Sequence, residues 1–278
     1  MNVSIIIINY NTCELTLNCL KSVFEQTKDI DFEVIVSDNG SKDRSIEMIK
    51  QEYPQVILIE NNANLGFGAA NNRGLKIAKG KYVFYLNSDT ILLNNAVKIF
   101  FDYWENSSEK NKIGALGCNL LSEQGEVIHS GGDFPKARRE LRSFFHCILS
   151  SIGIKRLYLK CGGRPKTYSY YVGEIGYVTG ADLFMLKNDD AIYDEKYFMY
   201  YEESDMQFQL QQKGKYSFII PGPKIIHLEG GSEKKDTTKY DFNKKTSRFY
   251  WESCCYFLRK NLKANFVAGL IRNMLKIL

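Results

Sequence analysis

The chain has 278 residues and a mass of 32.0 kDa, with 44% hydrophobic and 25% charged residues. These values suit one large folded domain or two small ones, and they exclude intrinsic disorder and collagen-like repeats. The apolar start, Val3 to Ile8, is far shorter than the ~20 residues needed to span a bilayer, and it lacks the basic flank of a signal peptide. Seven cysteines without a CxxC pair favour reduced, buried thiols in a cytoplasmic protein.

The net charge of +5 is distributed unevenly along the chain. Between Lys136 and Lys166 there are nine Lys or Arg residues and one acid, and between Lys244 and Leu278 there are eight and one. Each stretch predicts either a solvated basic face or a surface for anionic lipids or phosphates. No nucleic-acid motif accompanies the charge, so we expect no nucleic-acid partner.

The first hundred residues alternate between strand and helix patterns. The predicted strands cover 3–9, 32–37, 56–60 and 82–86, and the predicted helices cover 15–23, 45–53 and 69–78. This alternation predicts an α/β fold with a parallel sheet wrapped by helices, in which ligands bind beyond the carboxyl ends of the strands. Three of those ends carry polar residues, namely Asn9 and Asn11, Asp38 and Asn39, and Asn87 and Asp89. We therefore expect polar groups to converge on one rim.

The middle of the chain is less regular. Strands are predicted over 113–121, 125–130 and 216–220, with helices over 138–159, 204–213 and from about Thr238. Residues 177–186 lead into a strongly aromatic segment over 192–201. The basic stretch 138–159 reads as an excursion from the core. Because no repeat or flexible linker interrupts the pattern, we expect one continuous domain.

Two polar clusters near the predicted rim have competing interpretations. Asp38, followed by Asn-Gly-Ser, can accept hydrogen bonds from a ligand or hold its own loop as an Asx turn. Asn87 and Asp89 offer the oxygen ligands that hard divalent cations prefer, but Asp89 can equally cap a helix predicted over 91–101.

The second half of the chain contains two further candidates. Glu202, Glu203 and Asp205 precede a predicted helix, where they suit its N-terminal dipole or provide a general base toward a hydroxyl. His227 is either a structural imidazole or a metal ligand, and the Gly-Gly-Ser that follows at 230–232 permits close approach to a phosphate.

In this order, these motifs resemble glycosyltransferase family 2 of the GT-A fold, in the branch that includes bacterial rhamnosyltransferases. The resemblance extends from Val3 to about Asn261. Its carriers are 4–11, 36–43, 64–74, 86–90, 178–181, 198–205 and 227–232. It implies a Rossmann-like, mostly parallel sheet over residues 1–261, divided into a nucleotide-binding half (1–105) and an acceptor half (106–261) that contains the basic stretch 136–166.

The resemblance also implies roles for individual residues. Asn9, Asn11, Asp38 and Asn39 would surround the base and ribose. Asn64, Phe67 and Arg73 would lie near the diphosphate and donor sugar. Asp89 and His227 would bind Mn²⁺ or Mg²⁺ beside Asn87 and Ser88. Gly180 and Ala181 would line the sugar or acceptor site, and Glu203, flanked by Glu202 and Asp205, would be the catalytic base.

This chain departs from the family pattern at three points. The metal motif begins with Asn87 where the family often has Asp, which removes one charge. Glu203 replaces the usual Asp base, so Glu203, Glu202 or Asp205 could take that role. An Arg often found one turn later is absent, with Gln207 and Gln209 in that region.

The implied activity is an inverting, metal-dependent transfer of a sugar, with rhamnose as a first expectation, to a lipid-linked or polysaccharide acceptor of the bacterial surface. The alternative is a degenerate family member that binds glycan or lipid without turnover. Of the other enzymes with a similar sheet, a sugar nucleotidyltransferase needs an Arg-bearing glycine-rich loop after its first strand, and residues 11–14 do not provide one.

The last segment, 262–278, has the pattern of an amphipathic helix. Phe266, Leu270, Ile271 and Met274 share one face, and Arg272 lies away from it. This pattern predicts peripheral attachment to the inner face of the cell membrane, or packing against the domain or a second subunit of a homodimer.

Overall fold

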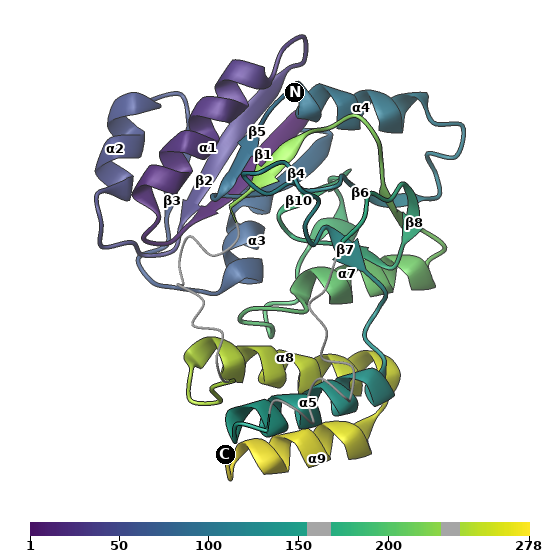
Figure 1. Cartoon of the computed structure of the whole chain (residues 1–278). Helices are drawn as coiled ribbons and strands as arrows, with labels where there is room; N and C mark the ends of the chain where they lie inside the picture. Colours follow the sequence, from purple (N-terminus) through teal and green to yellow (C-terminus); the bar gives the residue numbers. More distant parts are fainter. Residues whose placement is uncertain (155–167, 229–239) are drawn as a thin grey trace.

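The computed structural model describes residues 1–154, 168–228 and 240–278 (Figure 1). Three sequence predictions lie outside these residues: the distal part of the basic stretch, the Gly-Gly-Ser turn at 230–232, and a helix start near Thr238. In the described residues no helix has the length and apolarity needed to cross a bilayer.

Eight strands form the central sheet. Their spatial order is β3 (Ile57–Glu60), β2 (Phe32–Asp38), β1 (Val3–Asn9), β4 (Tyr82–Asn87), β10 (Asp182–Leu186), β6 (Ile113–Gly117), β11 (Tyr216–Ile219) and β8 (Gly173–Ile175). β1 to β4 pair in parallel, as do β6 and β11, whereas β10 and β8 are antiparallel to their neighbours. The mostly parallel α/β sheet is thus confirmed.

Helices flank the first half of the sheet, as Figure 1 shows. They are α1 (Cys13–Gln26), α2 (Ser45–Glu52), α3 (Phe67–Ile77) and α4 (Ala96–Asn106). Residues Val3 to Ile7 of β1 are all buried, because both faces of this sheet are covered. The continuous apolar run at the start of the sequence therefore corresponds to a central strand of the sheet.

The segment 177–186 forms two separate strands. β9 (Tyr177–Val178) pairs with β7 (Gly131–Gly132) outside the central sheet, and β10 begins only at Asp182. Gln207 of α7 (Glu202–Gln212) holds β9, because its side chain accepts from Val178 N and donates to Val178 O, each at 2.8 Å. The predicted strand 125–130 is wrong: it forms only one isolated bridge, between Leu121 and Val127.

A helical layer lies beyond one end of the sheet (Figure 1). It consists of α5 (Ala137–Ser151), α8 (Lys245–Leu262) and α9 (Asn265–Leu275). These helices share a second hydrophobic cluster that includes fully buried Phe144, Trp251 and Ile271. α5 therefore packs against α8 and α9 in this second cluster, apart from the main hydrophobic core of the sheet.

α9 belongs to this helical layer. Ala268 and Ile271 are buried, while Val267 and Met274 pack against the same cluster. Of the alternatives left open by the sequence, packing against the domain accounts for Ile271 and Met274, whereas Phe266 on the same predicted face is 83% exposed. The expected domain boundary between residues 261 and 262 falls inside this layer. α8 ends close to it, after Leu262, where Lys263 has a φ of 50° in the left-handed region.

Candidate active site

The carboxyl ends of β1 and β2 form the first part of the rim. Asn9 is fully buried and donates from Nδ2 to Asp38 Oδ1 (2.6 Å), while its Oδ1 accepts from Thr16 Oγ1 (2.7 Å). Asp38 Oδ2 accepts from the backbone N–H groups of Gly40 (3.1 Å) and Ser41 (2.9 Å). Asp38 thus forms the Asx turn that the sequence left as one alternative. The side-chain amide of Asn9 holds the carboxylate of Asp38 in place.

Asn11 and Asn39 organise the neighbouring loops. Asn11, at φ 54°, is exposed, and its Oδ1 accepts from Lys42 N at 2.7 Å. Asn39 donates from Nδ2 to Gly66 O at 3.1 Å, and its Oδ1 accepts from Leu65 N at 3.2 Å. The Asn11 contact joins the loops that follow β1 and β2, and the Asn39 contacts join the loop after β2 to the loop before α3.

The loop before α3 meets the segment before α7. Asn64 Oδ1 accepts from Gly66 N at 3.0 Å, and Phe67 N donates to Phe198 O at 2.9 Å. Gly66 has φ 87°, and a Cβ there would lie 2.3 Å from Phe198 O, so a side chain does not fit. This close approach brings Phe67 to the wall of a cavity that also contains Glu203.

The end of β4 brings together the expected metal ligands. β5 (Thr90–Leu92) pairs with β12 (Ile225–His227), with Thr90 opposite His227. His227 Nε2 consequently lies 3.2 Å from Asp89 Oδ1 and 3.4 Å from Asn87 Nδ2, although 138 and 140 residues separate them in sequence. Because β5 separates Asp89 from α4, the helix-capping interpretation of Asp89 is wrong.

These side chains fit a divalent cation as a partial ligand set. Two donors at adjacent octahedral positions lie about 3 Å apart, close to the observed Asp89–His227 distance. No group of three His, Cys, Asp or Glu side chains converges among the described residues, so further ligands would come from a diphosphate and water. A carboxylate with an imidazole suits Mn²⁺ at least as well as Mg²⁺. Ser88, the intervening residue, lies with its Oγ 3.3 Å from Thr12 Oγ1.

Two acids stand at the start of α7. The preceding residues, Tyr200 and Tyr201, have φ of 69° and 68°, so a sharp left-handed bend turns the chain into the helix. Glu202 is buried, and within the described residues its Oε2 has no hydrogen-bond partner. Burial raises the pKa of Glu203 to about 7 and holds the pKa of Glu202 well above its usual value. A proton acceptor near neutral pH is thus available.

Two cavities meet at Glu203. The smaller, about 290 Å³, is lined by Phe67, Asn87, Gly180, Ala181, Glu202 and His227. The larger, about 830 Å³, lies between the sheet domain and α5 and is lined by Arg139, Arg142, Tyr177, Tyr200 and Tyr250. Glu203 lines both. A carboxylate there can reach molecules bound on either side.

Two expected site residues are placed elsewhere. Asp205 is buried against α8, where it accepts from Lys260 Nζ (2.6 Å), Asn261 Nδ2 (2.6 Å) and the Tyr197 hydroxyl (3.1 Å). These contacts hold α7 to α8 and leave no free oxygen for a substrate, so Asp205 does not fit the alternative role of base. Arg73 is exposed on α3 and lines neither cavity.

The structure adds residues that the sequence patterns did not single out. Asp182, fully buried at the start of β10, accepts from Cys118 N at 2.7 Å, and burial raises its pKa to about 7. A lone acid inside an apolar strand was the available signal. Glu140 on α5 is also buried and accepts from the Tyr201 hydroxyl at 2.9 Å. No local pattern connects α5 with the start of α7.

Comparison with known proteins relates the chain to glycosyltransferases. Residues 4–156, more than half of the chain, match the family described as Glycosyl transferase family 2. An uncharacterized glycosyltransferase of Methanocaldococcus jannaschii, MJ1057, is 39% identical over 149 residues, which cover 51% of this chain and 50% of that protein. The chain therefore aligns with only half of this relative.

A longer alignment links the chain to a rhamnosyltransferase. The N-acetylglucosaminyl-diphospho-decaprenol L-rhamnosyltransferase of Mycobacterium tuberculosis is 25% identical over 221 residues, covering 74% of this chain and 70% of that protein. Among solved structures, GalNAc-T7 with UDP, GalNAc and Mn²⁺ has a TM-score of 0.58 at 17% identity, covering 95% of this chain and 51% of the other. That likeness shows a shared GT-A fold.

Proposed function

Because the chain belongs to glycosyl transferase family 2, we propose that it transfers a sugar from a nucleoside-diphosphate donor to a lipid-linked or polysaccharide acceptor, with inversion at the anomeric carbon. The observation that carries this proposal is the position of Glu203 at the junction of two cavities. A glycosyltransferase must hold two substrates with one base between them.

The smaller cavity is the proposed donor side. Asn87, Asp89 and His227 would hold the divalent metal there, which when bound neutralises charge on the diphosphate. Asp38 and Asn39 would position the loops that receive the nucleotide. Gly180 would border the donor sugar. A Cβ added there would lie only 3.1 Å from Phe67 Cε1, so the missing side chain leaves room for the Phe67 ring.

The larger cavity is the proposed acceptor side. Its tyrosines offer apolar faces and hydroxyl groups, and Arg139 and Arg142 offer planar donors that match phosphate oxygens. This combination suits a sugar carried on a diphosphate lipid. The relative from M. tuberculosis, whose name contains such an acceptor and rhamnose, supports the same class of acceptor and makes rhamnose the first donor sugar to test.

Glu203 would accept the proton of the acceptor hydroxyl as that oxygen attacks the anomeric carbon. The bond between that carbon and the diphosphate breaks on the opposite face, which inverts its configuration. Burial and the neighbouring Glu203 carboxyl raise the pKa of Glu202 well above its usual value, which favours the protonated form. In the described residues its Oε2 has no hydrogen-bond partner, so a protonated Glu202 would be able to donate a hydrogen bond to the donor sugar.

Thermal denaturation with dTDP, UDP and GDP, each with and without Mn²⁺ or Mg²⁺, tests the proposal. A nucleotide at ~100 times its Kd adds about 2.7 kcal/mol, which should raise Tm by about 5–10 °C. We expect a metal-dependent shift for one nucleotide. No shift with any of the three would argue for a degenerate, non-catalytic member.

A further inference from the structure

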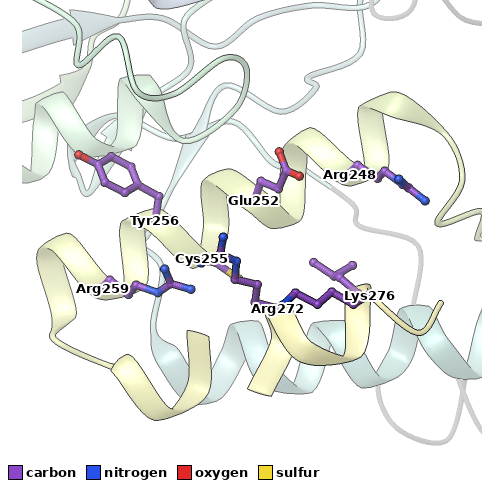
Figure 2. A pocket seen from close by; sticks show the side chains of 8 residues that line it. Arg248, Glu252, Cys255, Tyr256, Arg259, Arg272 and Lys276 are labelled. Atoms are coloured by element: carbon purple, nitrogen blue, oxygen red, sulfur yellow. The ribbon is translucent and has the colours of Figure 1, made fainter. Parts of the chain in front are cut away.

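The helical layer contains a groove that the proposed transfer does not use. The groove, about 660 Å³, lies between α8 and α9, and Figure 2 shows side chains of both helices around it. Arg248, Glu252 and Arg259 lie on one stripe of α8, at spacings of four and seven residues. Arg272 and Lys276 lie one turn apart on the facing side of α9. Four cationic side chains and one acidic side chain thus surround the groove.

The charge of these cations is left uncompensated by the described part of the chain. There, Arg259, Arg272 and Lys276 have no ion-pair partner, and Arg248 donates only to the carbonyl oxygen of Phe242, at 3.4 Å. The neighbouring Lys260 differs, since it pairs with Asp194 (2.8 Å) and Asp205 (2.6 Å). A bound anion would supply the missing partner for the groove.

Two of the cations converge from different helices. Figure 2 shows the side chains of Arg259, from α8, and Arg272, from α9, near Cys255, and all three line the groove. Burial raises the pKa of the Cys255 thiol to about 11, and the positive charges of both arginines oppose that rise. Paired guanidinium groups match the oxygens of a phosphate better than isolated ones.

Exposed apolar side chains stand on the same helix. Phe266 is 83% exposed on α9, and Ile277, which follows the helix, is 86% exposed. They are eleven residues apart, close to three full helical turns, so they share a stripe beside that of Arg272 and Lys276. Binding of a free phosphate ion would not involve these apolar side chains. A lipid surface accommodates both stripes, with phosphates on one and acyl chains under the other.

We propose that the α8–α9 groove is a docking site for the phosphate groups of anionic lipids, with Phe266 and Ile277 entering the interface beside it. Part of the apolar face of α9 that the sequence assigned to the membrane, Ile271 and Met274, packs in the second hydrophobic cluster, so contact with lipid falls to the groove, Phe266 and Ile277. The proposal does not depend on the chemistry at Glu203.

Sedimentation of the full chain with vesicles tests this docking site. The vesicles are pure phosphatidylcholine or contain about 30% phosphatidylglycerol. We expect binding to the anionic vesicles only. Since each basic side chain near an anionic surface strengthens binding about fivefold, R259Q/R272Q should weaken it about 25-fold. The charge-preserving R259K/R272K should weaken binding less than R259Q/R272Q, because Lys keeps the charge but lacks the planar pair of donors.

A matched control removes the same charge elsewhere. Arg44 and Lys76 are exposed on or beside α2 and α3, and R44Q/K76Q should bind the anionic vesicles like the unchanged chain. Equal losses in the two double-Gln variants would overturn the groove assignment and leave only a net-charge effect. Thermal denaturation of all variants with inorganic phosphate distinguishes the ligand source. If phosphate stabilises the unchanged chain but anionic vesicles do not bind it, the lipid assignment is overturned.

Discussion

The sheet rim and the helical layer contribute differently to the candidate site. The rim supplies the reactive groups, because Asn87, Asp89 and the loops after β1 and β2 stand where parallel strands end together. The helical layer supplies the wall of the larger cavity through α5 and a second hydrophobic cluster. Under the proposed function, metal binding would depend on the order of the strands, whereas acceptor binding would depend on how the helices pack beneath them.

Replacing Glu203 tests the reactive side of this comparison and should have the largest effect. E203Q should lower kcat about 10²- to 10⁴-fold because it removes the base, while nucleotide binding stays close to that of the unchanged chain. Single-turnover kinetics and calorimetry measure the two quantities. D205N is the matched variant, since Asp205 faces α8; full loss of turnover in D205N with E203Q active would reverse the assignment.

Shortening Phe144 tests the helical layer. Phe144 is fully buried and packs edge-on against Trp251 at 4.9 Å, so F144A should lower the free energy of unfolding by about 3–5 kcal/mol. Urea denaturation gives the value. The adjacent Phe145 is 42% exposed, and F145A should cost less than about 1 kcal/mol. Equal costs would show that α5 does not pack as described.

Removing a proposed metal ligand tests the coupling between β5 and β12. D89N or H227A should weaken nucleotide binding in Mn²⁺ at least about tenfold, with little change in its absence, because each supplies one of few protein ligands. Isothermal titration calorimetry with and without EDTA measures the difference. An unchanged metal dependence in both variants would contradict the assignment.

The pH profile gives the most graded test. Since burial raises the pKa of Glu203 to about 7, its basic form disappears as pH falls below that value. We expect kcat/KM to drop about tenfold per pH unit below pH 7 and to level off above it. Ionising a buried carboxyl also costs stability as pH rises through 7, so E203Q should gain stability relative to the unchanged chain in alkaline solution. A profile that is flat between pH 5 and 8 would contradict a base whose pKa is raised to about 7 by burial.

Much of the sheet domain could be predicted from the sequence. Strands such as 3–9 and 82–86 are short apolar runs bounded by polar turns, and this pattern is local. The polar residues at their ends were therefore located correctly. Their hydrogen bonds were less predictable: Asp38 is used by its own loop and Asn9 is buried behind it.

The helical layer shows what the sequence alone determined and what the tertiary structure decided. Local periodicity determined that residues 138–151 and 265–275 have an apolar face, and charge counting located the basic stretches. Only the fold decided that these faces meet each other and Trp251, that His227 reaches Asp89, and that Arg259 and Arg272 line one groove. The reason is physical: a sequence pattern specifies which side of a helix must be covered, while the residue that covers it can lie more than a hundred positions away, as Trp251 does from Phe144.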